Sequence, residues 1–155
     1  RAEKGVRMHT DQFHPEGPDN LLITSVDAAL AGQNTLLAAE SLGYGGVIIG
    51  LVRYQASEVA KLFNLPDYTY PVFGMALGVP NQNHPVKPRL PLEAVVFEES
   101  YQVQTPEVIE AFDQVQTAYA GARATDTWSQ RLAAQFGQEE PAATAELLKK
   151  HQLEK

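Results

Sequence analysis

The sequence predicts a mixed β-sheet with helices packed against it. Along the chain the predicted elements follow the order helix, strand, helix, strand, strand and then helices, which is typical of helices packed on a sheet. The 155 residues are 44% hydrophobic and 20% charged, which is ordinary for one domain that buries its own core. This composition excludes a disordered segment.

The first helix is predicted over 21–42, where apolar residues recur with near-helical spacing. Gly43 follows as the usual C-terminal stop. Residues 1–20 show no such periodicity and contain the proline and glycine typical of loops. We therefore expect an irregular lead-in over 1–20 and a domain over 21–155.

Three short stretches predict strands. Val47–Ile49 is wholly apolar between glycines and is expected to be a buried strand. Tyr68–Val79 is rich in residues that favour strands, and Ala94–Phe97 is a third candidate. Between the first two, Ser57 can cap a helix that runs through Phe63.

The last part of the chain predicts helices. Over Thr105–Ala120 a capping hydroxyl precedes a proline at the first helical position, which is a strong helix start. Asp126 is the expected N-cap of a helix through Phe136, and Thr144 is the expected N-cap of a final helix.

Charge and composition exclude several classes of protein. The net charge of -7 argues against a general binder of nucleic-acid backbones. No uninterrupted apolar run approaches the roughly 20 residues of a membrane span, and the N-terminal stretch lacks the apolar region of a signal peptide. The chain has no cysteine, which excludes disulfides and fits a reducing compartment. We expect a cytoplasmic protein.

The common hydrolytic and nucleotide-binding motifs are missing from the sequence: G-x-S-x-G, H-E-x-x-H and G-x-x-x-x-G-K-[ST]. The four histidines have no metal-ligand spacing, so we predict solvated surface side chains and no metal site. These are His9, His14, His84 and His151.

Two motifs are candidate ligand contacts. In GYGGVIIG, residues 43–50, glycines around the predicted strand allow a flat ligand or a phosphate to approach the backbone, although they also suit a helix end and a turn. In KPRLP, Lys87 and Arg89 flank the stiff Pro88 and are suited to clamping an anion such as phosphate. An ordinary surface loop whose charges only aid solubility would have the same sequence pattern.

A second pair of cations, Arg123 and Arg131, lies on either side of the sequence DTWS. Arg123 is placed to reach a second anionic ligand from a loop. We expect Trp128, within DTWS, to pack the start of its helix against the core.

Taken together and in order, DAALAGQNTLLAAESLGYGGVIIGLVR, PVFGMALGVP, KPRLP, SYQ and DTWS resemble the NADPH-using branch of the flavin nitroreductases. This branch includes the oxygen-insensitive NADPH nitroreductases and the NADPH-FMN oxidoreductases. The resemblance extends from Leu21 to about Leu132. It implies an α+β nitroreductase-like fold that binds FMN at the interface of an intertwined homodimer.

The resemblance also implies site residues, but no catalytic side chain. Ile48, Ile49, Gly50 and Leu51 would line the isoalloxazine ring, with the Gly50 N–H toward flavin N5. Lys87, Pro88 and Arg89 would hold the FMN phosphate, and Arg123 and Arg131 would approach the phosphate of NADPH.

The implied reaction passes a hydride from NADPH through bound FMN to nitroaromatic, quinone, azo or flavin acceptors in a ping-pong sequence. A flavin-binding protein without turnover and an inactive segment remain alternatives.

Two departures from the family qualify this implication. Leu51 replaces a second glycine, which predicts a narrower acceptor range. The arginine- and serine-containing segment with which the family begins has no match here, and Arg1 aligns well inside such a chain. We expect roughly the first third of a family member to be absent.

Overall fold

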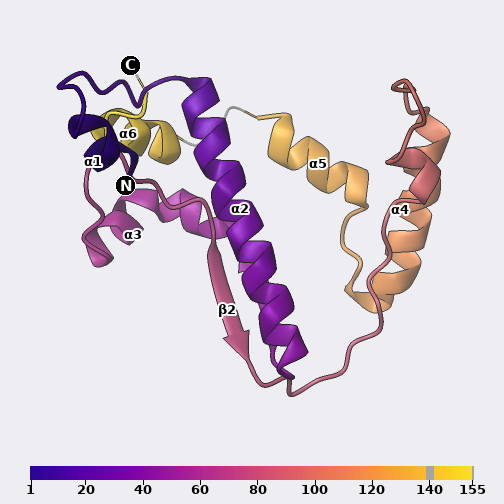
Figure 1. Ribbon diagram of the computed structural model, residues 1–155. Helices are drawn as coiled ribbons and strands as arrows, with labels where there is room; N and C mark the ends of the chain where they lie inside the picture. Colours follow the sequence, from indigo (N-terminus) through magenta and orange to yellow (C-terminus); the bar gives the residue numbers. More distant parts are fainter. Residues whose placement is uncertain (139–141, 155) are drawn as a thin grey trace. The chain divides into compact units, whose positions relative to one another are not determined.

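The computed structural model describes residues 1–138 and 142–154 (Figure 1). The chain divides into two compact units. The first unit comprises residues 1–82 with the C-terminal segment from 141 onward, and the second comprises residues 83–140.

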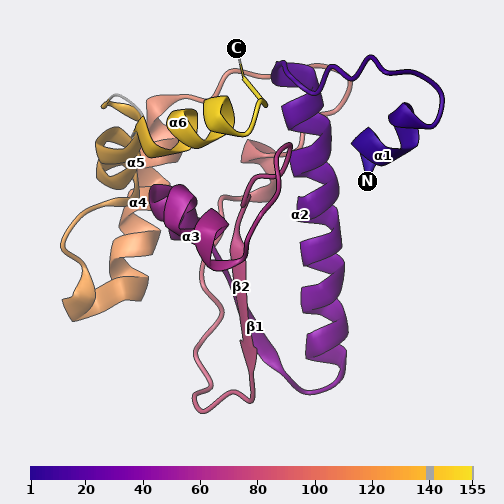
Figure 2. The same ribbon diagram turned by 90° about the vertical axis from the view of Figure 1, so that its left-hand side faces the viewer.

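The first unit combines helices with a two-stranded antiparallel sheet. Its elements are α1 (Ala2–Arg7), α2 (Pro18–Ser41), β1 (Gly45–Ile49), the 3₁₀ helix η1 (Gly50–Gln55), α3 (Ala56–Leu62), β2 (Gly74–Gly78) and α6 (Ala142–Lys150). In the sheet, Gly45 lies opposite Gly78 and Ile49 opposite Gly74. Helix α2 runs beside this hairpin in both views (Figures 1 and 2).

Glycine allows α2 and the hairpin to approach closely. A Cβ atom on Gly32 would lie 2.4 Å from the Phe73 ring, and one on Gly46 would lie 2.5 Å from Leu36. The predicted first helix is confirmed, and Gly43 follows it at φ +84°, the left-handed conformation that ends helices. The helix begins at Pro18, because proline suits the first helical turn.

The two strands differ from the expectations in burial and length. Strand β1 forms as predicted, but it is not buried: Val47 is 56% exposed. Strand β2 covers only the end of the predicted Tyr68–Val79. Tyr68 adopts φ +60°, which breaks an extended backbone.

The first unit buries a small core between α3 and α6, formed by Ala56, Ala60 and Leu147. His151 follows α6 and is only 5% exposed, with its Nδ1 atom 3.1 Å from the carbonyl oxygen of Pro66. The prediction of a solvated His151 is therefore wrong, because a tertiary contact that the sequence does not reveal satisfies the ring. His9, His14 and His84 are exposed as predicted.

The lead-in is not irregular throughout. Residues 2–7 form α1, in which the Arg7 guanidinium binds the Glu3 carboxylate at 2.8 Å. This pair is four residues apart, the spacing that supports a helical turn, and a charged pair leaves no hydrophobic periodicity.

The second unit is helical. It contains the 3₁₀ helix η2 (Leu92–Ala94), α4 (Pro106–Ala120), the 3₁₀ helix η3 (Gly121–Arg123) and α5 (Trp128–Phe136). Helix α4 forms where predicted. The predicted strand Ala94–Phe97 is wrong, because the amides of Ala94 and Val95 donate to the carbonyls of Pro91 and Leu92 and close 3₁₀ turns instead.

Two predicted helix caps also differ. Thr127, not Asp126, caps α5, and it exchanges hydrogen bonds with Gln130 in a capping box. Thr144 lies inside α6 and not before it, and its hydroxyl donates to the Arg53 carbonyl at 3.3 Å.

Among the described residues, α2 alone is long and apolar enough to cross a membrane by length and composition. Core helices of globular proteins pass the same test. Polar residues such as Asp27 and Asn34 interrupt its sequence, and one side of the helix packs on the hairpin.

Candidate functional site

The second unit contains a basic pocket of about 420 Å³. All four cations that the sequence analysis singled out line it. The lining residues are Lys87, Pro88, Arg89, Phe112, Gln116, Tyr119, Ala120, Arg123, Trp128 and Arg131. The structure therefore gathers at one pocket the two cation pairs that the resemblance relates to two different phosphates.

Among the described residues, no aspartate or glutamate lines this pocket. Across residues 1–138 and 142–154, none of the four cations makes an ion pair with a carboxylate, and all four side chains are exposed. In a chain of net charge -7, such a cluster favours an anion that carries more than one charge.

Backbone contacts orient two of the arginines. The Nη1 atom of Arg89 donates to the carbonyls of Lys87 and Pro88 at 3.1 and 3.3 Å. The Nη1 atom of Arg131 donates to the Asp126 carbonyl at 3.0 Å. A guanidinium carries five N–H donors, so these contacts leave donors on both arginines for a bound anion.

The start of α5 is fixed against α4 at the side of the pocket. Trp128 packs edge-on against Phe112, with ring centroids 5.1 Å apart and an interplanar angle of 85°, which confirms the predicted packing role of Trp128. Asp113 accepts hydrogen bonds from the Ser129 amide and hydroxyl at 2.8 and 2.5 Å. Partial burial opposes ionisation of Asp113, but these hydrogen bonds outweigh it and lower its pKa.

The residues related to the flavin ring lie in the first unit. Ile48 and Ile49 end β1, while Gly50 and Leu51 begin η1. Leu51 is 71% exposed. The basic pocket belongs to the second unit, so the ring segment and the phosphate candidates are each positioned by a different unit.

Arg53 is a neighbour of this segment that its sequence position does not reveal. A Cβ atom on Gly50 would lie 3.3 Å from its guanidinium nitrogens, and its Nη1 atom donates to the Val72 carbonyl at 2.8 Å. In the sequence, Arg53 stands out only as a cation three positions after Gly50, the last glycine of GYGGVIIG. The contact itself depends on how η1 turns the chain back.

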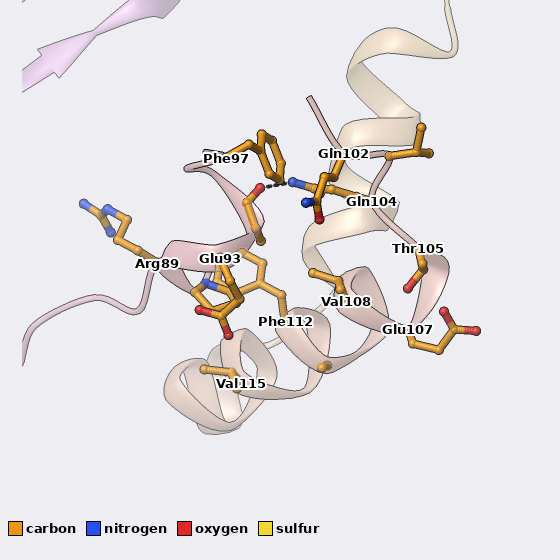
Figure 3. A pocket seen from close by; sticks show the side chains of 14 residues that line it. Arg89, Glu93, Phe97, Gln102, Gln104, Thr105, Glu107, Val108, Phe112 and Val115 are labelled. Atoms are coloured by element: carbon orange, nitrogen blue, oxygen red, sulfur yellow. Dashed lines mark hydrogen bonds between the residues drawn. The ribbon is translucent and has the colours of Figure 1, made fainter. Parts of the chain in front are cut away.

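The second unit also holds an apolar pocket of about 590 Å³ between α4 and the segment 91–105 (Figure 3). Arg89 and Phe112 line both pockets, and in Figure 3 the Arg89 guanidinium points away from the Phe112 ring. The Gln104 amide donates to the Ala94 carbonyl beside this pocket. In the described part of the chain, no cluster of three or more acidic or histidine side chains could hold a metal ion.

Comparison with known families gives two matches that together cover most of the chain. The model of the nitroreductase family matches residues 6–79, and the model of the C-terminal domain of the nitroreductase family matches residues 87–155.

Individual proteins agree with these matches. The chain is 46% identical over 115 residues to an NADPH-flavin oxidoreductase of Vibrio harveyi, covering 72% of this chain and 48% of that protein. It is 42% identical over 118 residues to an oxygen-insensitive NADPH nitroreductase of Salmonella typhimurium, covering 74% and 49%. The chain thus spans about half the length of these relatives.

A solved structure has the same fold as this chain. Nitroreductase A from Vibrio parahaemolyticus superposes with a TM-score of 0.88 at 38% identity, covering 97% of this chain and 63% of that one. This likeness confirms the predicted α+β class.

Proposed function

The chain belongs to the nitroreductase family, and on this premise we propose that it forms part of an NADPH-dependent oxidoreductase that uses FMN. The observation that carries the proposal is the basic pocket, in which four cations line one cavity and form no ion pair with a carboxylate of the described residues. The relatives named as an NADPH-flavin oxidoreductase and an NADPH nitroreductase support the same activity.

The donors of this chain fit the phosphate and the ring of FMN. The phosphate is a dianion, and Lys87 and Arg89 offer it an ammonium and a guanidinium on either side of Pro88. The Ile48–Leu51 segment offers the ring an apolar edge, and the Arg53 guanidinium lies beside Gly50.

Bound FMN would supply the redox chemistry, passing electrons from NADPH to a nitroaromatic, quinone, azo or flavin acceptor in a ping-pong sequence. The chain's own tasks are binding and orientation. Lys87 and Arg89 would hold the FMN phosphate, Ile48–Leu51 would orient the ring with the Gly50 N–H as a donor, and Arg123 and Arg131 would bind the NADPH phosphate. None of these roles requires a nucleophile or an acid-base pair.

We also propose a homodimer of this chain in the cytoplasm. Many apolar side chains of α2 are exposed, and Leu30, near the middle of the helix, is 60% exposed. A second copy packed on this face would remove that apolar surface from water. The missing cysteines suit a reducing compartment.

The visible spectrum of the purified full chain, recorded before and after anaerobic addition of NADPH, tests the proposal. A flavin spectrum that bleaches with NADPH is the expected result. A flavin spectrum that NADPH leaves unchanged would indicate a flavin-binding protein without turnover. A colourless chain that does not take up added FMN would overturn the proposal in favour of an inactive segment.

A further inference from the structure

The segment 80–90, which carries Lys87 and Arg89, lacks a regular structure that could hold it in place. It contains three prolines, at 80, 85 and 88, which remove backbone donors. No backbone–backbone hydrogen bond among the described residues involves 80–90. Side chains from elsewhere must therefore set the position of the two cations.

Two side chains of α4 supply this anchorage. The Gln116 amide donates to the Pro88 carbonyl at 3.1 Å, and the Tyr119 hydroxyl donates to the Pro85 carbonyl at 3.2 Å. Tyr119 follows Gln116 by three positions, so both lie on one face of the helix. That face therefore tethers the segment at two points.

The Gln116 amide binds the carbonyl of the residue that lies between the two cations. Pro88 stands between Lys87 and Arg89, and its carbonyl also accepts a hydrogen bond from the Arg89 guanidinium at 3.3 Å. Gln116 is only 7% exposed, whereas both cations are exposed. The buried Gln116 amide thus holds the backbone between two exposed cationic side chains.

We propose that Gln116 is a positioning residue for the phosphate clamp, an inference that rests on the proposed binding of FMN by Lys87 and Arg89. By fixing the Pro88 carbonyl, Gln116 directs both cations into the same pocket before the ligand arrives. Such preorganisation lowers the entropy cost of ordering long side chains on binding. Without Gln116 the charges remain, but the clamp is no longer prearranged.

The test compares FMN with riboflavin, which has the same ring but no phosphate, by fluorescence titration of the full chain. Gln116→Leu removes the donor and nearly keeps the volume. From the usual net worth of one hydrogen bond we expect about 3- to 10-fold weaker FMN binding, with riboflavin affinity unchanged. Gln116→Met, which also keeps the length of the side chain, serves if the leucine variant does not fold.

The remaining outcomes separate the possible failures. Equal FMN affinity in the variant and the unsubstituted chain, or an equal loss of FMN and riboflavin affinity, would overturn the role of Gln116. Lys87→Ala with Arg89→Ala is the comparator. If that double variant leaves the preference for FMN over riboflavin intact, the phosphate clamp itself is wrong, and the proposed function fails at this site.

Discussion

The Asp113 carboxylate on α4 accepts hydrogen bonds from both the amide and the hydroxyl of Ser129, at 2.8 and 2.5 Å. These two bonds hold the start of α5 against α4. This contact explains the serine of the DTWS sequence. Its neighbour Trp128 packs on Phe112, and Arg131 follows within the first turn of α5. The start of α5, held in this way against α4, therefore positions Trp128 and Arg131 in the lining of the basic pocket.

Asp113→Asn should lower the free energy of unfolding at pH 7 by about 1 kcal/mol, the usual worth of a helix-capping contact. Because the folded-state pKa of Asp113 is lowered, its stabilisation is complete above the unfolded value of about 3.9 and is lost as pH falls through the folded value. Urea unfolding at pH 7 and pH 3 should therefore show a difference in unfolding free energy between the variant and the unsubstituted chain that is smaller at pH 3.

Asp126→Asn is the matched control for this effect. The Asp126 carboxylate accepts a hydrogen bond from the hydroxyl of the adjacent Thr125 and, among the described residues, contacts no second helix through a hydrogen bond. A gap between Asp113→Asn and the unsubstituted chain that stays constant from pH 7 to pH 3 would contradict the role of the Asp113 charge.

Lys87→Ala combined with Arg89→Ala should weaken FMN binding by about 10- to 100-fold, because each cation offers a charge-assisted hydrogen bond. The dependence of FMN affinity on salt should flatten as well. Lys149→Ala with Lys150→Ala removes the same charge from α6, whose lysines are not among the residues that line the pocket. Similar losses in the two double variants would mean that net charge, and not a clamp, governs binding.

Local chemistry made parts of the fold predictable. Gly43 ends α2, and the proline after Thr105 begins α4, because these residues act through their own backbone. The prediction of a strand over 94–97 is wrong, because the described part of the second unit offers no strand to pair with it. The amides of 94 and 95 donate instead to the carbonyls of 91 and 92.

The candidate site was predictable by residue type but not by arrangement. Lys87 and Arg89 stand out in an acidic chain, and so do Arg123 and Arg131. That all four line one pocket depends on tertiary contacts, such as that of Gln116 with the Pro88 carbonyl. A buried glutamine on a helix gives no sequence signal of this kind.

Arg123→Ala and Arg131→Ala should each raise the KM for NADPH by about tenfold and leave the KM for NADH nearly unchanged. The two cofactors differ by one phosphate, and a charge-assisted hydrogen bond to it is worth about 1.5 kcal/mol or more. Steady-state kinetics with both cofactors gives the comparison. An equal rise in both KM values would remove the residue in question from phosphate recognition.

Leu51→Ala should widen the range of acceptors. Leu51 follows Gly50 at the start of η1 and projects an apolar side chain that is 71% exposed, so beside a bound flavin it would occupy space that an acceptor needs. Shortening it should raise kcat/KM for bulky quinones or nitroaromatics by about tenfold relative to small ones, the discrimination expected from a few methyl groups.

Leu62→Ala is the matched control, because Leu62 is a similarly exposed leucine of the same unit, at 74%, and stands at the end of α3. It should leave the ratio between bulky and small acceptors unchanged. If Leu51→Ala instead lowers kcat/KM for all acceptors alike, Leu51 is an apolar contact for the acceptor and not a wall. Lost flavin with an unchanged ratio would assign Leu51 to cofactor binding alone.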